Sequence, residues 1–192
     1  YNVKIGAHPS FFDLEGFGRR KMDLELNELE SIIFYQVSAL KGITESYGKK
    51  LHHVKPHGAL YNMASINDDI AETIVLSIKK IDPKLKLYGP SKMKWKEISK
   101  KHKIEYVSEV FSDRNYNDNL TLVDRDNENS MITDIDNSIN HLSRMIENGK
   151  VKTINKKFID IDAETICIHG DQPNAHIFAK TIYNTFKSKI VK

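Results

Sequence analysis

The 192-residue sequence has one cysteine and no long apolar run. Because the lone Cys167 cannot form an internal disulfide, the sequence favours a reducing compartment, and we expect a cytoplasmic protein. No apolar run approaches the roughly 20 residues that cross a bilayer, and no signal-peptide pattern is present, so we expect no membrane partner. The length is enough for one sizeable core, which predicts a single domain over residues 1–192.

The sequence also lacks a strong excess of charge of either sign. Its 29 basic and 26 acidic residues nearly balance, leaving a formal net charge of +3. The lysines are scattered, and no basic run is interleaved with aromatic residues, so we expect no nucleic-acid partner. Three lysines near the end of the chain are typical of a solvated helix end.

Short signatures of common catalytic and nucleotide-binding sites are missing. There is no HExxH, no CxxC, no Walker A loop, and no GxGxxG at a strand–helix turn. The run Gly16-Phe17-Gly18 lacks a third glycine and is interpreted as a hinge. Cys167 lies in an apolar strand, which favours a small buried residue over a nucleophile. Any chemistry must therefore come from residues spread along the chain.

Short apolar strands alternate with amphipathic helices about five times, which predicts an α/β fold with parallel strands and helical crossovers. We expect strands over 3–7, 51–57, 85–89, 104–111 and 165–168. We expect helices from Asp23 as N-cap to Gly48, over 67–81, 92–102 and 133–148, and from Asn174 onward. A small hairpin over 151–161 and a polar loop over 112–132 complete the prediction; a loop this long is either functional or disordered.

The most informative stretch covers residues 51–62 and reads LHHVKPHGALYN. Side chains alternate between the faces of a strand, so His53, Lys55 and His57 would share one face. Pro56 has no backbone donor, and we expect the strand pairing to fail there. Lys55 and His57 would then lie at the carboxyl end of a strand, where α/β folds place their ligands. The alternative is a solvated edge strand followed by a turn.

Ionisable residues also collect at the ends of the other expected strands. The full set is His8, Lys55, His57, Glu109, Asp113, Arg114, His169 and Asp171. If the strands are parallel, all these ends lie on one rim. Such a set could support hydrolysis or group transfer at a carbonyl, with histidine or carboxylate moving protons and the cations stabilising negative charge. Three histidines with Asp171 could instead ligate a divalent metal, although no tight ligand spacing supports this.

Several motifs closely resemble those of the LamB/YcsF family, and they follow in the same order along essentially the whole chain. They are residues 5–10 (IGAHPS), 16–20 (GFGRR), 53–62 (HVKPHGALYN), 109–114 (EVFSDR) and 165–171 (TICIHGD). The run over 53–62 is highly specific to that family.

This resemblance implies an irregular seven-stranded (β/α) barrel like that of glycoside hydrolases and polysaccharide deacetylases. Family members carry the segments NCDLGE and CGFHAG before the point where this sequence starts, so the barrel is expected to lack its N-terminal one or two βα units. The implied activity is that of ATP-dependent 5-oxoprolinase, in which family members form the A subunit and which opens the lactam of 5-oxo-L-proline to L-glutamate. ATP is the implied cofactor, a divalent metal is possible, and the B and C subunits of 5-oxoprolinase are the implied partners. The truncated chain alone could be inactive.

Under this implied reaction, the catalytic candidates are Lys55, His57, Glu109, His169 and Asp171. The substrate-binding candidates are His8, Arg19, Arg20, Asp113 and Arg114. Lys55 and Arg114 would neutralise phosphate or the developing oxyanion, and Arg19 or Arg20 would hold the substrate carboxylate. His57 or His169, oriented by Asp171, would act as general base. Two alternatives remain open: a metal-dependent amidase or deacetylase without ATP, and a non-catalytic substrate-binding subunit.

Overall fold

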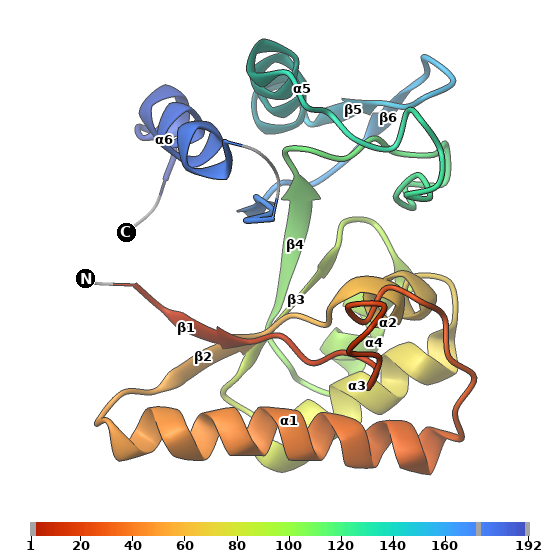
Figure 1. The fold of residues 1–192 in the computed structure, drawn as a ribbon, viewed down its shortest axis with the longest axis vertical. Helices are drawn as coiled ribbons and strands as arrows, with labels where there is room; N and C mark the ends of the chain where they lie inside the picture. The colour runs from red at the N-terminus through yellow and green to blue at the C-terminus, as the bar shows by residue number, and fades with distance from the viewer. Residues whose placement is uncertain (1–2, 172–173, 191–192) are drawn as a thin grey trace. The chain divides into compact units, whose positions relative to one another are not determined.

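The computed structural model describes residues 3–171 and 174–190 (Figure 1). The chain divides into two compact units, Tyr1–Ser108 and Glu109–Lys192. In both units the secondary structure alternates between strands and helices. No helix in the described part of the chain is both long and apolar enough to span a bilayer.

The first unit contains parallel strands joined by helices, as the alternating pattern predicts. Its elements are β1 (Ile5–Ala7), α1 (Leu26–Ser46), β2 (Leu51–Val54), α2 (Gly58–Ala64), α3 (Asp68–Ile81), β3 (Lys86–Pro90) and α4 (Lys94–Lys101), and β4 (Tyr106–Phe111) begins there. Strand β2 pairs in parallel with β1 on one side and with β3 on the other. The N–H of Leu87 in β3 donates to the carbonyl of Glu105, just before β4.

Helices α1 and α3 bury apolar stripes whose members are three or four residues apart. In α1 the buried apolar residues are Leu29, Ile33 and Val37, and α3 buries a similar row from Ile70 to Ile78. In Figure 1 the long helix α1 runs beneath β1 and β2 and beside α3, which it contacts. The sequence predicts one stripe from Leu26 to Leu40 in steps of three and four; this packing confirms it in the middle, whereas Leu26 in the first turn is exposed and Leu40 is half-buried.

The starts of α3 and α1 compare differently with the sequence. Asn67 caps α3, its side-chain oxygen accepting from the N–H groups of Asp69 and Ile70. Helix α1 begins later than expected, with Glu25 rather than Asp23 as N-cap. Glu25 and Glu28 form a reciprocal capping box that satisfies backbone donors at the helix start, which explains the shift.

Backbone pairing between β1 and the chain after β2 continues beyond Pro56. The expectation that the pairing fails at Pro56 is therefore wrong on the side that faces β1. The N–H of Lys55 donates to the carbonyl of Ala7 at 2.9 Å, and that of His57 to Pro9 at 2.8 Å. Successive residues of a strand point their donors to opposite neighbours, so the missing donor of Pro56 faces away from β1. The short helix α2 then begins at once, where the sequence predicts only a turn.

The second unit contains the last residues of β4 and the rest of the chain. Its elements are α5 (Ile135–Asn148), β5 (Lys150–Lys152), β6 (Phe158–Asp160), β7 (Thr165–Cys167) and α6 (Ala175–Phe186). Strand β4 pairs in parallel with β7, and β5 and β6 form the predicted antiparallel hairpin. Gly149 ends α5 in the left-handed conformation, as expected. Cys167 is buried, in agreement with its predicted place in an apolar strand.

The long loop after β4 is irregular but internally bonded. Two isolated antiparallel bridges, Arg114–Met131 and Tyr116–Leu122, fold it back on itself. The phenol of Tyr116 accepts the N–H of Phe111 at 2.9 Å inside the unit. The loop therefore has a defined path, and the chain has the α/β class with parallel strands that the sequence predicts.

Candidate functional site

In the first unit, the strand-end histidines His8 and His57 lie against each other. Nδ1 of His57 is 2.9 Å from Nε2 of His8, and the two rings meet edge to face with centroids 4.7 Å apart. The remaining ring nitrogen of each contacts a backbone carbonyl: Nδ1 of His8 bonds the carbonyl of Lys55, and Nε2 of His57 lies 2.7 Å from the carbonyl of Phe17. The structure thus brings together the ends of β1 and β2 and the loop that follows β1.

Backbone hydrogen bonds hold that loop in place. The run Gly16-Phe17-Gly18, which the sequence suggests is a hinge, therefore forms a turn with a fixed conformation. The N–H of Gly18 donates to the carbonyl of Asp13, and the N–H of Ala59 at the start of α2 donates to the carbonyl of Gly18 at 3.0 Å. Gly58 has a φ of +57°, and a Cβ there would come within 2.5 Å of the Gly18 oxygen. Only glycine permits this close approach.

The two arginines of the loop have different surroundings. The guanidinium of Arg20 bonds the carboxylate of Asp13, which also accepts the N–H of Gly16. The bond from Arg20 lowers the pKa of Asp13 to about 2, against the opposing effect of burial. Arg19 instead lies over the ring of Phe17, 5.0 Å from its centroid, and that ring meets His57 edge to face. Arg20 is therefore committed to the loop, whereas Arg19 lies beside the ring that contacts His57.

His53 lies in a packed environment. Its ring stacks on Tyr88 with centroids 4.0 Å apart, and on its other side a Cβ at Gly6 would come within 2.1 Å of Nε2. Desolvation first, and the charges of His52 and Lys55 next, lower the pKa of His53 to about 4. His53 is therefore neutral near pH 7, and Gly6 is the sequence signal of its close packing.

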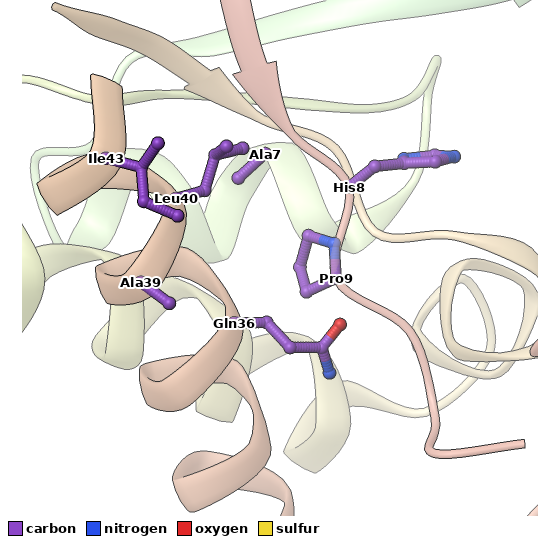
Figure 2. Close-up of a pocket in the computed structure, with 7 residues that line it drawn as sticks. All are labelled: Ala7, His8, Pro9, Gln36, Ala39, Leu40 and Ile43. Carbon is purple, nitrogen blue, oxygen red and sulfur yellow. The ribbon is translucent and has the colours of Figure 1, made fainter. Parts of the chain in front are cut away.

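A cavity of about 340 Å³ lies between the end of β1 and helix α1 (Figure 2). Figure 2 shows Ala39, Leu40 and Ile43 of α1 on one side, whereas the ring of His8 points away from them. The side-chain amide of Gln36 bonds both backbone groups of Ser10, accepting its N–H at 3.0 Å and donating to its carbonyl at 2.7 Å. This hollow is largely apolar; His8 is among its lining residues, but its ring points away from α1, and His57 does not line it.

In the second unit, His169 and Asp113 come together where β7 and β4 end. Nδ1 of His169 is 2.9 Å from both carboxylate oxygens of Asp113, which is completely buried. The sequence assigned orientation of this histidine to Asp171, but the carboxylate bonded to its ring is that of Asp113; Asp171 lies in the exposed turn beyond. A buried carboxylate that holds Nδ1 fixes the tautomer of the ring and directs Nε2 outward as a proton acceptor.

Glu109 and Arg114, the other two candidates on β4 and after it, are both buried. The guanidinium of Arg114 donates to the backbone carbonyls of Val123 and Ser130, so it ties down the long loop. Glu109 lies opposite Thr165 in the β4–β7 pairing. These contacts give Arg114 a structural task that its position in the sequence did not indicate.

The donors for a metal ion do not meet within the described part of the chain. There, no group of three or more histidine, cysteine, aspartate or glutamate side chains is arranged to hold an ion. The histidine pair of the first unit and the imidazole–carboxylate pair of the second each contain two such side chains. Neither pair resembles a closed or an open zinc site.

Comparison with known proteins gives consistent matches over almost the whole chain. The model of the LamB/YcsF family matches residues 1–192. A protein of Bacillus cereus (strain 03BB102), named as the A subunit of 5-oxoprolinase, is 44% identical over 188 residues, which cover 97% of this chain and 74% of that protein. A protein of the same name from Bacillus cytotoxicus is 42% identical over 187 residues, with 97% and 74% covered.

A solved structure shares the fold as well. The crystal structure of a lactam utilization protein from Thermus thermophilus superposes with a TM-score of 0.87 at 36% identity, over 97% of this chain and 74% of that one. The family match, the identities and the superposition agree with the motifs that surround His8, Lys55, His57 and His169. The chain therefore belongs to the LamB/YcsF family.

Proposed function

We propose that this protein is the A subunit of a cytoplasmic, ATP-dependent 5-oxoprolinase, which opens the lactam of 5-oxo-L-proline to L-glutamate. The observation that carries the proposal is 44% identity, over 97% of this chain, to a protein named as that subunit of 5-oxoprolinase. The likeness to a lactam utilization protein supports the same class of substrate. A name that specifies one lettered subunit supports the existence of partners, which we take to be the B and C subunits.

The proposed chemistry follows from the stability of the lactam amide. Transfer of the γ-phosphoryl group of ATP to the lactam oxygen would make the ring carbon electrophilic. Water would then add to that carbon and the carbon–nitrogen bond would break, with a proton passing to the nitrogen, which leaves an acyl phosphate. A second water would hydrolyse this acyl phosphate to glutamate and phosphate. A divalent metal ion, if bound with the nucleotide, would supply positive charge to the phosphates. In a reaction of this kind the protein supplies charge, orientation and proton transfer.

We assign the general base to His169 because Asp113 holds its Nδ1 and leaves Nε2 to take a proton from water. Glu109 is the second acid–base candidate. Lys55, which follows β2, and Arg19, which lies over the ring of Phe17 beside His57, are the cations we assign to the substrate carboxylate or phosphate. Asp113 thereby changes from a substrate-binding candidate to the residue that positions the base.

We further propose that the complete domain is the irregular seven-stranded barrel, with one or two βα units amino-terminal to β1. Two observations support this proposal. The matched region is 74% of the relatives' length, so they contain additional chain. Within the described residues β1 pairs only with β2, and its other edge could accept a further strand.

The test is glutamate release from 5-oxoproline by the full-length chain mixed with the B and C subunits. We expect glutamate only when ATP is present, and a fall of about 10²- to 10⁴-fold in turnover for His169→Ala. His176→Ala is the matched control, because His176 lies on the exposed surface of α6, and we expect it to leave turnover unchanged. Glutamate formed equally without ATP would instead support a metal-dependent amidase. Unchanged turnover with weaker substrate binding in His169→Ala would support a non-catalytic binding subunit.

A further inference from the structure

The backbone on both sides of Asp113 is held by hydrogen bonds from other parts of the second unit. The peptide carbonyl before it, that of Ser112, accepts the hydroxyl of Ser138 on α5 at 2.8 Å. The carbonyl of Asp113 itself accepts the N–H of Ile132 at 2.9 Å. Because a peptide group is planar, fixing the two carbonyls that flank a residue restricts its φ and ψ, and with them the direction of its side chain.

Ser112 also joins the end of β4 to the end of β7. Its N–H and its hydroxyl both donate to the carbonyl of Cys167, at 3.1 and 2.9 Å. Cys167 is the last residue of β7 and comes two positions before His169. Ser112 and Ser138 are both completely buried. The N–H, hydroxyl and carbonyl of Ser112 are all bonded inside the unit, so this residue is a rigid start for the step to Asp113.

The contact between Asp113 and His169 requires this precision. Both carboxylate oxygens lie 2.9 Å from Nδ1 of His169, and one of them also accepts the backbone N–H of His169 at 3.4 Å. The imidazole stacks on the ring of Phe111, with centroids 5.8 Å apart and an interplanar angle of 24°. A shift of the carboxylate by about 0.5 Å would take the Nδ1 contact beyond ordinary hydrogen-bond distance.

The hydroxyl of Ser138 bonds outside its own helix. A serine within a helix commonly donates to the carbonyl one turn earlier, as Ser77 of α3 does to Thr73 at 2.7 Å. The hydroxyl of Ser138 instead reaches the carbonyl of Ser112, which is 26 positions away in the sequence. Its hydrogen bond therefore fixes the segment after β4 to helix α5.

We propose that Ser138 is a positioning residue of the proposed active site. Its hydroxyl acts through the carbonyl of Ser112 and places the carboxylate of Asp113. That carboxylate in turn keeps the proton of His169 on Nδ1 and leaves Nε2 to take a proton from water. The inference rests on the proposed function for the role of His169 as general base, whereas the placement of the carboxylate can be tested without any activity.

NMR on full-length protein labelled with ¹⁵N-histidine reports which nitrogen of the neutral His169 ring carries the proton. We expect Nδ1 in the wild type, and in Ser138→Ala a shift of part of the population to Nε2. Ser77→Ala is the matched control, because Ser77 is also a completely buried helix serine whose hydroxyl donates to a backbone carbonyl, and it should keep the wild-type tautomer. The wild-type tautomer in Ser138→Ala would overturn the proposal.

Ser112→Ala is a second variant for the same measurement. It removes one of the two donors to the carbonyl of Cys167 and keeps the backbone N–H as the other. We expect it to shift the tautomer of His169 in the same direction as Ser138→Ala.

Turnover by the full-length chain assembled with the B and C subunits gives a kinetic test. Ser138→Ala should lower kcat by about 10- to 100-fold with little change in KM, because a small misplacement of a catalytic group slows the reaction without weakening binding. In an Asp113→Ala background the same substitution should cause no further loss, since no carboxylate remains to be positioned. Ser77→Ala should leave kcat unchanged in both backgrounds.

The double-variant comparison separates positioning from a general effect on the fold. Equal losses from Ser138→Ala with and without the Asp113 carboxylate would overturn the proposal, because the serine would then act independently of that carboxylate. A shifted tautomer of His169 in a protein that never forms glutamate would refute only the proposed function and would leave the positioning by Ser138 standing.

Discussion

At the scale of single residues, the polar side chains at the strand ends differ in the groups to which they hydrogen-bond. Asp113 is completely buried and bonds His169 through both carboxylate oxygens, whereas Arg114 bonds backbone carbonyls. A carboxylate is the partner that stabilises an imidazolium as it forms, and a backbone carbonyl is the partner that fixes a loop. The Asp113–His169 pair is therefore where we expect a small chemical change to have a large kinetic effect.

Replacing Asp113 by asparagine should reduce turnover by about 10²- to 10⁴-fold in the assembled enzyme. Asparagine keeps an oxygen that can accept the Nδ1 proton but lacks the charge that stabilises the imidazolium. The measurement is kcat and its pH profile for wild type and Asp113→Asn, in which the rate limb assigned to the base should move. Asp171→Asn should cause a smaller loss; if it caused the larger one, Asp171 would be the orienting residue.

The positions of the candidate residues could be predicted from the sequence, but their partners could not. Strand ends are recognisable because apolar runs stop at His8, Pro56 and His169, and parallel strands place their ends on one side. Which carboxylate meets His169 depends on the β4–β7 pairing, which joins residues more than fifty positions apart. The Asp13–Arg20 bond likewise depends on the turn between them. Periodicity carries no information about such distances.

At the scale of secondary-structure elements, the predicted helices and strands are largely confirmed. The short helix α2 was not predicted, and the buried face of α5 includes polar residues. Helix α2 was missed because Pro56 and Gly58 indicate a turn, and the seven-residue helix begins directly at that glycine. In α5 the apolar stripe expected at Ile135, Ile139, Leu142 and Ile146 is fully buried at Leu142 and half-buried at the other three, while Ser138 and His141 also occupy buried positions. Ser138 donates to the carbonyl of Ser112 at 2.8 Å, so a hydrogen bond makes its burial acceptable.

The close contact between Gly18, in the loop after β1, and Gly58, at the start of α2, leaves no space for an added methyl group. Gly58→Ala should destabilise the protein by about 1–3 kcal/mol, because alanine is strained at a φ of +57° and its Cβ would meet the oxygen of Gly18 at 2.5 Å. Relief of that contact would displace Phe17 and Gly18 beside His57 and Arg19, so binding of 5-oxoproline by the assembled enzyme should weaken too. Urea unfolding and calorimetric titration measure the two effects.

Gly42→Ala is the matched control for this substitution. Gly42 lies inside helix α1, and a Cβ there would meet nothing within 4 Å. Alanine should therefore raise the free energy of unfolding by roughly 0.5–1 kcal/mol through its helix propensity and leave 5-oxoproline binding unchanged. A stability loss at Gly42 as large as that at Gly58 would contradict the explanation from backbone conformation and close approach.

At the scale of the whole molecule, each unit contains a histidine that burial, partial in one case and nearly complete in the other, keeps neutral near pH 7. In the first unit it is His53, and in the second it is His141 on α5. Burial first, and the charge of Arg144 next, lower the pKa of His141 to about 4. Nε2 of His141 is buried and has no hydrogen-bond partner among the described residues, so protonation would place an unsatisfied charge inside the unit.

These two histidines should make the protein less stable in mild acid. Between the ordinary histidine pKa of 6.5 and the native value of about 4, the unfolded chain binds more protons than the folded one, so the free energy of unfolding falls as the pH falls. For His141 the loss between pH 7 and pH 5 should be about 2 kcal/mol. His53 should contribute less, since solvent reaches part of its ring. The carboxyl of Asp13, with a pKa of about 2, adds its own dependence only below about pH 4.

Urea unfolding at pH 7, 6 and 5 tests this expectation with wild type, His53→Gln, His141→Asn and the double variant. Asparagine at position 141 can keep a donor near the position of Nδ1 but has no group that titrates in this range. Each variant should be less stable than the wild type at pH 7, because packing is lost, yet its stability should fall less steeply toward pH 5. The double variant should be the flattest of the four. A double variant with the pH slope of the wild type would mean that other groups cause the acid sensitivity, and that the two histidines are protonated without cost.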